Sequence, residues 1–422
     1  MDLFEKAVKN IGPLGQYANK LHGYFTFPKL EGDINTRMLF NGKEKTIWAL
    51  SDYLGIASIA EVKETDVQSL KEYGLLNPMG SRITTGHSSL HEQLELKLAE
   101  FSEKESAFVL NNAYQGMISI IDAIADRKDV IIYDSDCNAG IIDGARLHIG
   151  KRFVYQHNNI DNLKKQLERA SKLVKETGGI ILVITQGVFE LSGSIGRIDE
   201  IIKLKKEFRF RLMVDDSHGI GVLGATGRGI GEHFGLQASI DIYFSSFENA
   251  FVSMGAYVAS KKELIRYLAY NMRSQTFAGS LSAHIVAGIY KRLEVIDLHP
   301  EFREQLLKIS QSLQSGLRSN GFNTGNSQAA ITTVYLSGDT SEATHIAVEL
   351  REKFNIFCHV LGYPVIPKGM IQIRFFASRL HTLIDVRDVI NAMIEIRSRL
   401  ENGAYYAGEA AHLSVLESNP LS

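Results

Sequence analysis

The sequence predicts an α/β fold, with a large domain on a mostly parallel sheet and a smaller α+β domain near the C-terminus. The main observation is a series of short apolar runs that alternate with helical stretches between about residues 106 and 290. Such runs are typical of strands that are buried on both faces of a parallel sheet. They are Val130–Tyr133, Ile180–Ile184, Leu212–Val214, Ile242–Phe244 and Ala256–Ala259.

Length and composition agree with this prediction. With 422 residues, 45% hydrophobic and 22% charged, the chain can bury a large core and form two or three lobes. Its 46 Lys and Arg residues nearly balance its 48 Asp and Glu residues, so no basic field indicates nucleic acid. No run of roughly 20 apolar residues predicts a transmembrane segment, and only two cysteines indicate a reducing compartment. We expect a cytoplasmic protein without a metal site.

The pattern divides the chain into four segments. Residues 1–60 are expected to hold an N-terminal helix and short strands, and residues 61–290 the large domain. Residues 291–400 are expected to form a linking helix and the small domain, and residues 401–422 a mobile tail. Further strands are expected around Arg37–Phe40, Thr46–Leu50, Ile331–Leu336, Phe354–Val360 and Met370–Phe376, and helices around Leu90–Phe101, Ala283–Asp297, Glu342–Lys353 and Ile384–Leu400.

The residues that follow the run Leu212–Val214 indicate a ligand site. Asp215 and His218 come just after the strand's carboxyl end, where parallel sheets bind ligands. The acid can pair with a protonated ring nitrogen and the imidazole can bond a neighbouring oxygen, so together they can hold a flat ring such as that of pyridoxal phosphate. An ordinary capping acid and a loop histidine are the alternative for these two residues alone.

Four segments along the chain carry a more specific signal. They are Asp52–Gly55 (DYLG), Gly80–Glu95 (GSRITTGHSSLHEQLE), Val214–Gly229 (VDDSHGIGVLGATGRG) and Ile373–Thr382 (IRFFASRLHT). In this order they resemble the NYLG, GSR…G…LHxxLE, VDxAHxxGVLGxxGRG and LRxxxSxxHT motifs of the α-oxoamine synthases. The resemblance implies the fold-type-I, aspartate aminotransferase-like fold of pyridoxal-phosphate-dependent transferases. It also implies a dimer that transfers an acyl group from a coenzyme A or acyl-carrier-protein thioester to an amino acid.

One departure from the family concerns its Schiff-base lysine, which lies in a strand-end TxxK motif. The corresponding stretch is Ser246–Gly255 (SFENAFVSMG), in which Asn249 falls at the lysine. A carboxamide neither forms an imine nor acts as a useful general base. Lys261 and Lys262 follow the next strand and are expected to be exposed. We therefore expect pyridoxal phosphate to be held without a covalent bond or not at all.

Two other departures fall at the expected cofactor contacts. Asn138 stands where the family has a histidine that stacks on the pyridine ring. Asn112, Ala113 and Tyr114 stand where the family usually has a small residue, glycine and an aromatic residue around the phosphate. Ala113 lacks the backbone freedom of glycine, although amides at a helix N-terminus can still bind an anion.

Other family positions are retained. Ser246 keeps a hydroxyl at a phosphate-contacting position, and Ser280 corresponds to a residue that acts across the subunit interface. Arg374 keeps a guanidinium that would clamp a substrate carboxylate, with a surface ion pair as the alternative. Gly219–Gly224 fits GxGxxG, but Asp215–His218 separate these glycines from the strand and more glycines follow where a helix should run. We therefore do not expect a nicotinamide site.

Three functions are compatible with these residues. The first is a subunit that pairs with a lysine-bearing homologue, as in the eukaryotic serine palmitoyltransferase of this family. The second is an enzyme that handles acyl thioesters without an imine, with Asp215 and His218 as an acid/base pair. The third is a conventional synthase, homodimeric like its family, whose lysine was replaced by Asn249 in the laboratory. Because Asn138 and Ala113 deviate as well, we favour natural divergence.

Overall fold

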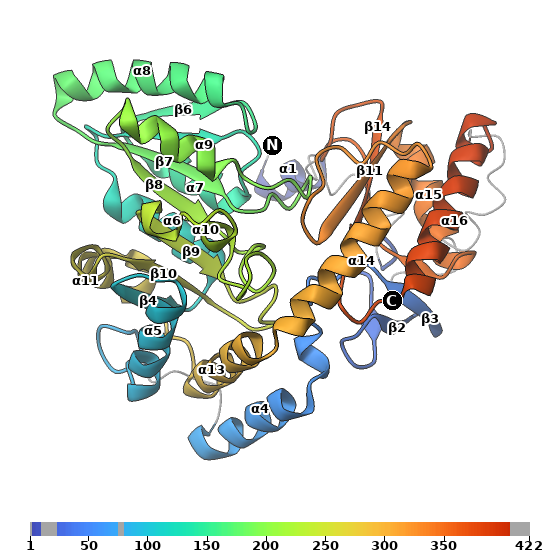
Figure 1. The fold of residues 1–422 in the computed structure, drawn as a ribbon, viewed down its shortest axis with the longest axis horizontal. Helices are drawn as coiled ribbons and strands as arrows, with labels where there is room; N and C mark the ends of the chain where they lie inside the picture. The colour runs from blue at the N-terminus through green and yellow to red at the C-terminus, as the bar shows by residue number, and fades with distance from the viewer. Residues whose placement is uncertain (1, 10–22, 75–79, 406–422) are drawn as a thin grey trace.

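A seven-stranded sheet at the centre of the large lobe confirms the predicted fold class (Figure 1). The computed structural model describes residues 2–9, 23–74 and 80–405. The strand order is β4-β10-β9-β8-β7-β5-β6; β10 pairs antiparallel with both of its neighbours, and the other pairs in this sheet are parallel. The strands are β4 Ser106–Leu110, β5 Val130–Asp134, β6 Lys151–Tyr155, β7 Ile181–Gln186, β8 Arg211–Asp215, β9 Ile242–Ser246 and β10 Ala256–Ser260.

All five strands predicted for this sheet are present, and two further strands were not predicted. β6 lies at the sheet's edge and is mostly exposed, so its sequence shows no continuous apolar run. β4 has a four-residue apolar run that the sequence pattern does not separate from the helix before it. A short apolar run therefore identifies a central strand of this sheet more reliably than an edge strand.

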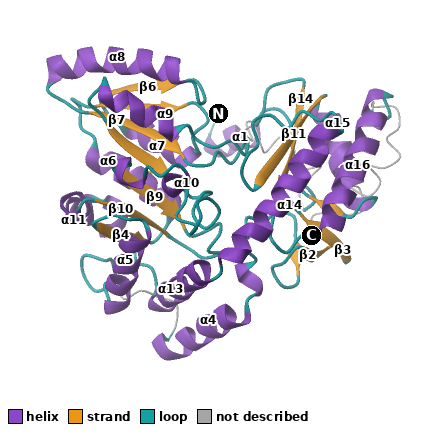
Figure 2. Cartoon of the chain, viewed as in Figure 1, coloured by secondary structure: helices purple, strands orange, loops and turns teal. Residues whose placement is uncertain are grey.

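Helices cover both faces of this sheet (Figure 2). Successive residues of β7 point to opposite sides: Ile181 and Val183 join one hydrophobic core, and Leu182 and Ile184 join the other. This two-sided burial explains the continuous apolar runs. The helices of this lobe are α4 Ala60–Tyr73, α5 Ser89–Phe101, α6 Ala113–Ile124, α7 Ala139–Leu147, α8 Ile160–Thr177, α9 Ile198–Lys203, α10 Ile230–His233, α11 Lys262–Asn271, α12 Arg273–Thr276 and α13 Ala283–Leu298.

The small lobe follows helix α14 (Pro300–Ser319), which runs from the large lobe into it (Figure 1). Pro300 occupies the first turn of α14, where a missing N–H costs no helical hydrogen bond. Capping boxes begin the next two helices, α15 (Thr340–Glu352) and α16 (Leu383–Glu401). These helices pack with an antiparallel sheet of order β11-β14-β13, made of β11 Ile331–Ser337, β14 Met370–Phe376 and β13 His359–Leu361.

A second small sheet pairs three strands near the N-terminus with one strand of the small lobe. Its order is β1-β2-β3-β12, and β12 pairs in parallel with β3. The predicted single strand Phe354–Val360 is therefore wrong, because the chain leaves this sheet at Cys358 and enters the other sheet one residue later. The predicted strand Thr46–Leu50 is shifted, since β3 ends at Ile47. The strands are β1 Leu30–Glu31, β2 Arg37–Phe40, β3 Lys43–Ile47 and β12 Ile356–Phe357.

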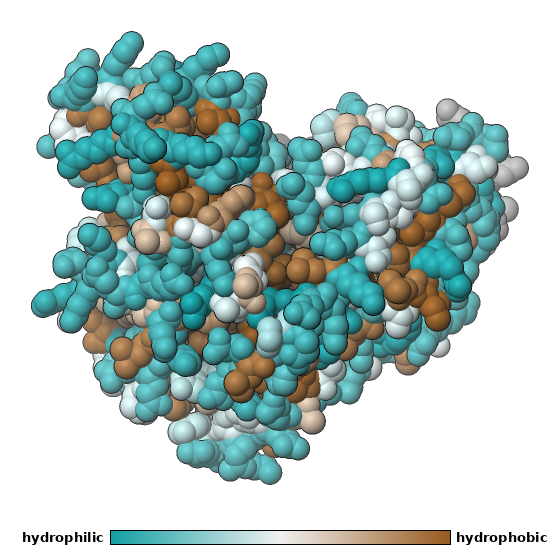
Figure 3. Space-filling model, viewed as in Figure 1, coloured by the Kyte–Doolittle hydropathy of each residue, from teal (hydrophilic) through white to brown (hydrophobic). Residues whose placement is uncertain are grey.

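The chain's two ends are described only in part. Helix α1 (Leu3–Lys9) agrees with the expected N-terminal helix, but residues 10–22 lie outside the described residues. Most of the expected mobile tail, residues 406–422, also lies outside them. None of the described helices combines the length and the apolar character that a bilayer crossing requires. The face shown in Figure 3 is predominantly hydrophilic.

Candidate functional site

A cavity of about 430 Å³ lies at the carboxyl ends of β8 and β9, where the strand-end argument places a site. Its lining comes from both lobes, since His359 and Phe376 belong to strands of the small lobe. The lining residues are Ala49, Ser51, Ala113, Tyr114, Met117, Asn138, Ala139, Gly140, Glu190, Asp215, Ser217, His218, Phe244, Ser246, Glu248, Asn249, His359 and Phe376.

Most of the predicted site residues lie in this cavity. The predicted residues that line it are Ala113, Tyr114, Asn138, Asp215, His218, Ser246 and Asn249. Asn112, Ser280 and Arg374 do not line it. Asn112 caps α6, with its Oδ1 accepting the N–H of Gln115 at 2.9 Å. Ser280 lies against the Gly80 loop, donating its N–H to the Gly80 carbonyl at 2.9 Å, so its expected role across a subunit interface stays a prediction.

The Asp215 carboxylate is buried at the end of β8, and both of its oxygens have partners within the chain. Oδ1 accepts from the N–H of Ser217 at 3.0 Å and from its hydroxyl at 2.5 Å. Oδ2 accepts from Nδ2 of Asn138 at 2.5 Å. Burial raises the pKa of Asp215, and these hydrogen bonds oppose the rise. A ring nitrogen would have to compete with Asn138 for this carboxylate.

His218 has different partners from those expected. Its Nδ1 lies 2.8 Å from the hydroxyl of buried Tyr53, and its Nε2 lies 3.7 Å from Oε2 of Glu190. The expected direct pairing of His218 with Asp215 is therefore wrong, because the protein satisfies Asp215 elsewhere. Contact with His218 lowers the pKa of Glu190 to about 2, so Glu190 is ionised at neutral pH. The carboxylate that orients the imidazole is Glu190.

Arg374 reaches the same group from β14. Its Nη1 lies 3.4 Å from Oε1 of Glu190 and 3.3 Å from the Glu190 carbonyl oxygen. The side chain is only 8% exposed, and its ion pair with Glu190 lies beside the cavity rather than on the open surface. The expected clamp on a substrate carboxylate stays a prediction. A substrate carboxylate would have to share this guanidinium with Glu190.

Asn249 lies in the turn that joins the antiparallel strands β9 and β10. Its Nδ2 donates to the carbonyl oxygen of Ser217 at 2.8 Å, and its own carbonyl accepts the N–H of Val252 at 2.9 Å. Val252 has φ 47°, a strained conformation for a β-branched residue and one that occurs mainly at functional sites. Lys261 and Lys262 are exposed, as predicted, and neither lines the cavity.

The first turn of α6 and the turn after β9 face the same cavity. The twelve-residue helix α6 presents Ala113 and Tyr114 there, and a helix N-terminus favours an anion. The hydroxyl of Ser246 accepts the N–H of Glu248 at 2.9 Å, and the side chain of Glu248 lines the cavity from an exposed position. Partial desolvation raises the pKa of the Glu248 carboxyl. The protein therefore places a carboxyl group of its own, that of Glu248, in this part of the cavity lining.

The lining as a whole does not fit pyridoxal phosphate. It contains three carboxylates, Glu190, Asp215 and Glu248, but neither a lysine nor an arginine. An imine needs a primary amine, and a phosphate that approaches a like charge without a cation beside it binds poorly. Burial lowers the pKa of His359 to about 4, so this histidine supplies no cation at neutral pH. The lining offers no amine for the bond and places no lysine or arginine beside a phosphate.

The glycine-rich segment after His218 has a packing role. An ideal Cβ at Gly219 or Gly229 would lie only 1.9 or 1.8 Å from an oxygen of Asp216. Only glycine allows this close approach of the backbone to the buried carboxyl group, whose pKa burial raises to about 8. The next helix, α10, begins at Ile230, so the GxGxxG glycines do not open a helix.

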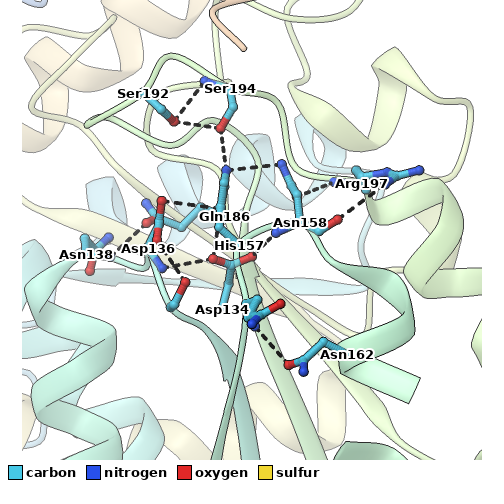
Figure 4. Close-up of polar contacts among 12 residues, drawn as sticks. Asp134, Asp136, Asn138, His157, Asn158, Asn162, Gln186, Ser192, Ser194 and Arg197 are labelled. Carbon is cyan, nitrogen blue, oxygen red and sulfur yellow. Dashed lines mark hydrogen bonds and ion pairs between the residues drawn. The ribbon is translucent and has the colours of Figure 1, made fainter. Parts of the chain in front are cut away.

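A second polar cluster lies beside the cavity at the ends of β5 and β7 (Figure 4). We call Asp134, His157, Asn158 and Ser194 the loop cluster. His157 Nδ1 lies 2.9 Å from Asp134 Oδ1, and its Nε2 lies 2.9 Å from Ser194 Oγ. Asn158 donates its N–H to Asp134 Oδ2 at 2.9 Å and its Nδ2 to the Ile195 carbonyl at 3.0 Å. These bonds fix the loop that carries Glu190.

The loop cluster is neither a metal site nor a nucleophile. Ligand atoms of Asp134, Asp136 and His157 lie within 4.8 Å of one another. Both imidazole nitrogens and both Asp134 oxygens, however, already have protein partners. The order Ser194–His157–Asp134 matches a catalytic triad, but Ser194 is only 1% exposed and does not line the cavity. The cluster therefore has a structural role.

Three residues of the cavity network were missed by sequence reasoning: Tyr53, Glu190 and Glu248. Tyr53 and Glu248 lie inside segments that the resemblance uses, but neither was assigned a role. Glu190 lies four residues beyond the end of β7, and no pattern places it against a histidine 28 positions later. Its position after a buried strand is the only signal that could have identified it.

A family profile, two known proteins and one solved structure show what this chain is similar to. The profile of the aminotransferase class I and II family matches residues 43–385. The Cysteate-C-fatty acyltransferase of Capnocytophaga ochracea is 47% identical over 96% of this chain and 97% of that protein. The 8-amino-7-oxononanoate synthase of Thermosipho melanesiensis is 33% identical over 90% of this chain and 96% of that protein. The Sphingomonas wittichii serine palmitoyltransferase structure superposes with a TM-score of 0.84 at 25% identity, covering 96% of this chain and 100% of its own.

Proposed function

This chain belongs to the class I and II aminotransferase family, among its α-oxoamine synthase-like acyltransferases, and we propose that it binds an acyl thioester without forming an imine. The observation that carries the proposal is the lining of the cavity, in which none of the 18 residues offers a primary amine. Asn249, at the position that the motif gives to the lysine, is held by its hydrogen bond to Ser217. The chemistry that the family performs through a lysine then needs a second chain or a different mechanism.

The first role we propose is that of a subunit paired with a lysine-bearing homologue. Exposed apolar side chains near the first turn of α6 support it, because such side chains mark an interface. Tyr114 and Phe277 are 48% and 76% exposed. The segment that holds Phe277 is tied to α6 by a hydrogen bond from Asn111 Nδ2 to the Gly279 carbonyl at 2.7 Å.

Purification of the tagged chain from its native cell tests this role. We expect a lysine-bearing homologue to co-purify in equal amounts, and a strict homodimer would contradict the proposal. Phe277→Glu should weaken the association, because a charge would be buried at the interface. Leu147→Glu is a matched control, since Leu147 is 59% exposed at the end of α7, outside that surface.

A second role is supported by the position of His218, whose Nδ1 is hydrogen-bonded to Tyr53 and whose Nε2 lies 3.7 Å from Glu190. An imidazole held between a hydroxyl and a carboxylate is suited to act as a general base. In thioester hydrolysis, Nε2 of His218 would take a proton from water as the water oxygen bonds to the thioester carbonyl carbon, while its Nδ1–H donates to the Tyr53 oxygen. The carbon–sulfur bond would then break, and the thiolate would leave with that proton.

Thiol release from acyl-CoA or acyl carrier protein tests the second role. We expect the wild-type chain to release thiol faster than His218→Ala, with Glu190→Gln between them because the imidazole loses its orienting partner. Equal rates for wild type and His218→Ala would end this proposal. The first role would be unaffected, because it requires no turnover by this chain alone.

Natural divergence remains our proposal for the origin of Asn249. The hydrogen bond from Asn138 to Asp215 and the carboxylate of Glu248 both disfavour the cofactor, and a laboratory replacement at position 249 would have produced neither. The alternative, a conventional synthase, requires Asn249→Lys alone to regain imine absorption on addition of pyridoxal phosphate. A colourless Asn249→Lys protein would eliminate that alternative.

A further inference from the structure

We infer that the cavity excludes pyridoxal phosphate altogether, bound covalently or not, and that Asn249→Lys alone does not restore cofactor binding. The inference rests on the proposed function and goes beyond it. A chain that lacks the lysine could still hold the cofactor by its phosphate and its ring. Two features of this cavity oppose those two contacts, and both are independent of Asn249.

The first feature is the charge of the cavity lining. Two helix N-termini face the cavity, that of α6 at Ala113 and Tyr114 and that of α7 at Ala139 and Gly140, and either could receive a phosphate. Glu248 lines the same cavity, and its N–H is already bonded to the hydroxyl of Ser246. A phosphate monoester carries about −1.5 to −2 charges at pH 7. It would share the cavity with this carboxylate and with no lysine or arginine of the lining.

The second feature is the fixed amide of Asn138. Its Nδ2 donates to Asp215 Oδ2 at 2.5 Å, while its Oδ1 accepts the N–H of Ile141 at 3.1 Å and caps α7. Its backbone N–H donates to Oε1 of Gln186 at 2.8 Å. The amide therefore cannot turn away from Asp215 without giving up the cap. A pyridinium nitrogen would have to share Oδ2 of Asp215 with this fixed amide.

The test compares three variants by equilibrium dialysis and by imine absorption with pyridoxal phosphate. We expect Asn138→His/Glu248→Ser/Asn249→Lys to bind the cofactor and form an imine. Asn249→Lys alone should bind at least about tenfold more weakly, as Coulomb repulsion within one cavity implies. Asn138→His/Glu304→Ser/Asn249→Lys is the matched control, because it loses the same charge from an exposed position on α14. Equal affinities for Asn249→Lys and the first triple variant would overturn the inference.

Pyridoxal, which lacks the phosphate, isolates the contribution of charge. Glu248→Ser should improve binding of pyridoxal phosphate to the Asn138→His/Asn249→Lys protein more than binding of pyridoxal. The difference should shrink as salt is added, because solvent-accessible charges are screened. An equal gain for both ligands would overturn the assignment to Glu248. Thermal melting followed by circular dichroism identifies the folded variants.

The wild-type chain gives a test that needs no variant. We expect no pyridoxal phosphate to remain after dialysis and no rise in melting temperature when it is added. Stoichiometric cofactor without an imine would overturn this inference and leave the proposed function standing. A borohydride-reducible adduct on a lysine of this chain would overturn both, and mass spectrometry distinguishes the two results.

Discussion

Two polar groups lie at the same carboxyl edge of the large sheet, and they differ in how deeply their charges are buried. In the loop cluster, the Asp134 carboxylate is completely buried, and both of its oxygens and both nitrogens of His157 are bonded. In the cavity, the Glu190 side chain pairs with His218 and Arg374 but is 45% exposed, and Glu248 is exposed as well. The comparison shows that the buried cluster holds the loop in place, whereas the exposed carboxylates face the open cavity.

The largest expected effect comes from Asp134→Ala in the loop cluster. The change leaves His157 and two backbone N–H groups without their carboxylate, and breaking a buried pair in this way costs about 3–5 kcal/mol. The free energy of unfolding in urea measures the loss. Glu263→Ala, on the exposed start of α11, is the control and should change it by less than about 0.5 kcal/mol. A loss as small as the control's would break the comparison.

Asn138→Ala changes the cavity lining and should have an intermediate effect. It removes the cap of α7 and leaves an oxygen of Asp215 unbonded, for a loss of about 1–2 kcal/mol. Asn159→Ala removes a cap at the start of α8 and one exposed hydrogen bond to Gln156, so it should cost less. Urea unfolding of both variants checks the order. Equal losses would mean that the bond to Asp215 contributes nothing.

The loop cluster should also give the protein a pH dependence. Burial lowers the pKa of His157, but the Asp134 carboxylate outweighs burial and leaves that pKa raised above its usual value. The resulting stabilisation is complete below the unfolded pKa of about 6.5 and is lost as the pH rises through the folded value. The urea midpoint of the wild type should therefore fall relative to His157→Gln above about pH 6.5. Urea midpoints of the wild type and of His157→Gln that change in parallel from pH 5 to 9 would contradict this prediction.

The smallest effect is expected in the cavity, from Glu248→Gln. This change removes one of three carboxylates that share the lining, so it should be neutral or stabilising, by less than about 1 kcal/mol. Thermal unfolding at low and high salt measures it, and the gain should be smaller at high salt. A clear destabilisation would show that Glu248 is a structural residue like Asp134.

The sequence predicts the sheet well where burial alone determines the pattern. The five central runs need only apolar side chains on two faces, and each appears in the structure. The edge strand β6 and the division between β12 and β13 depend on which sheet a segment joins. Pairing of this kind is decided by distant partners, such as β3 for β12, and leaves no local signal.

The candidate site is predictable at the strand ends but not beyond them. Asp215, His218 and Asn249 reach the cavity because the topology brings the carboxyl ends of β8 and β9 together. The carboxylate that orients His218 comes from a loop, and that loop is placed by the hydrogen bonds of His157 and Asn158. Side chains that are positioned by such tertiary hydrogen bonds leave no periodic pattern in the sequence.

The short strand β12 has a consequence for synthesis of the chain. Phe40 and Ile47, near the start, pack in one apolar cluster with Val348 and Phe357, more than 300 residues later in the sequence. Segments so distant cannot bury one another until the ribosome has released both, and contacts of this kind slow folding. The first strands therefore emerge early and wait, with their apolar face uncovered, for most of translation. A chaperone that shields residues 37–47 during this interval should raise the yield of folded protein.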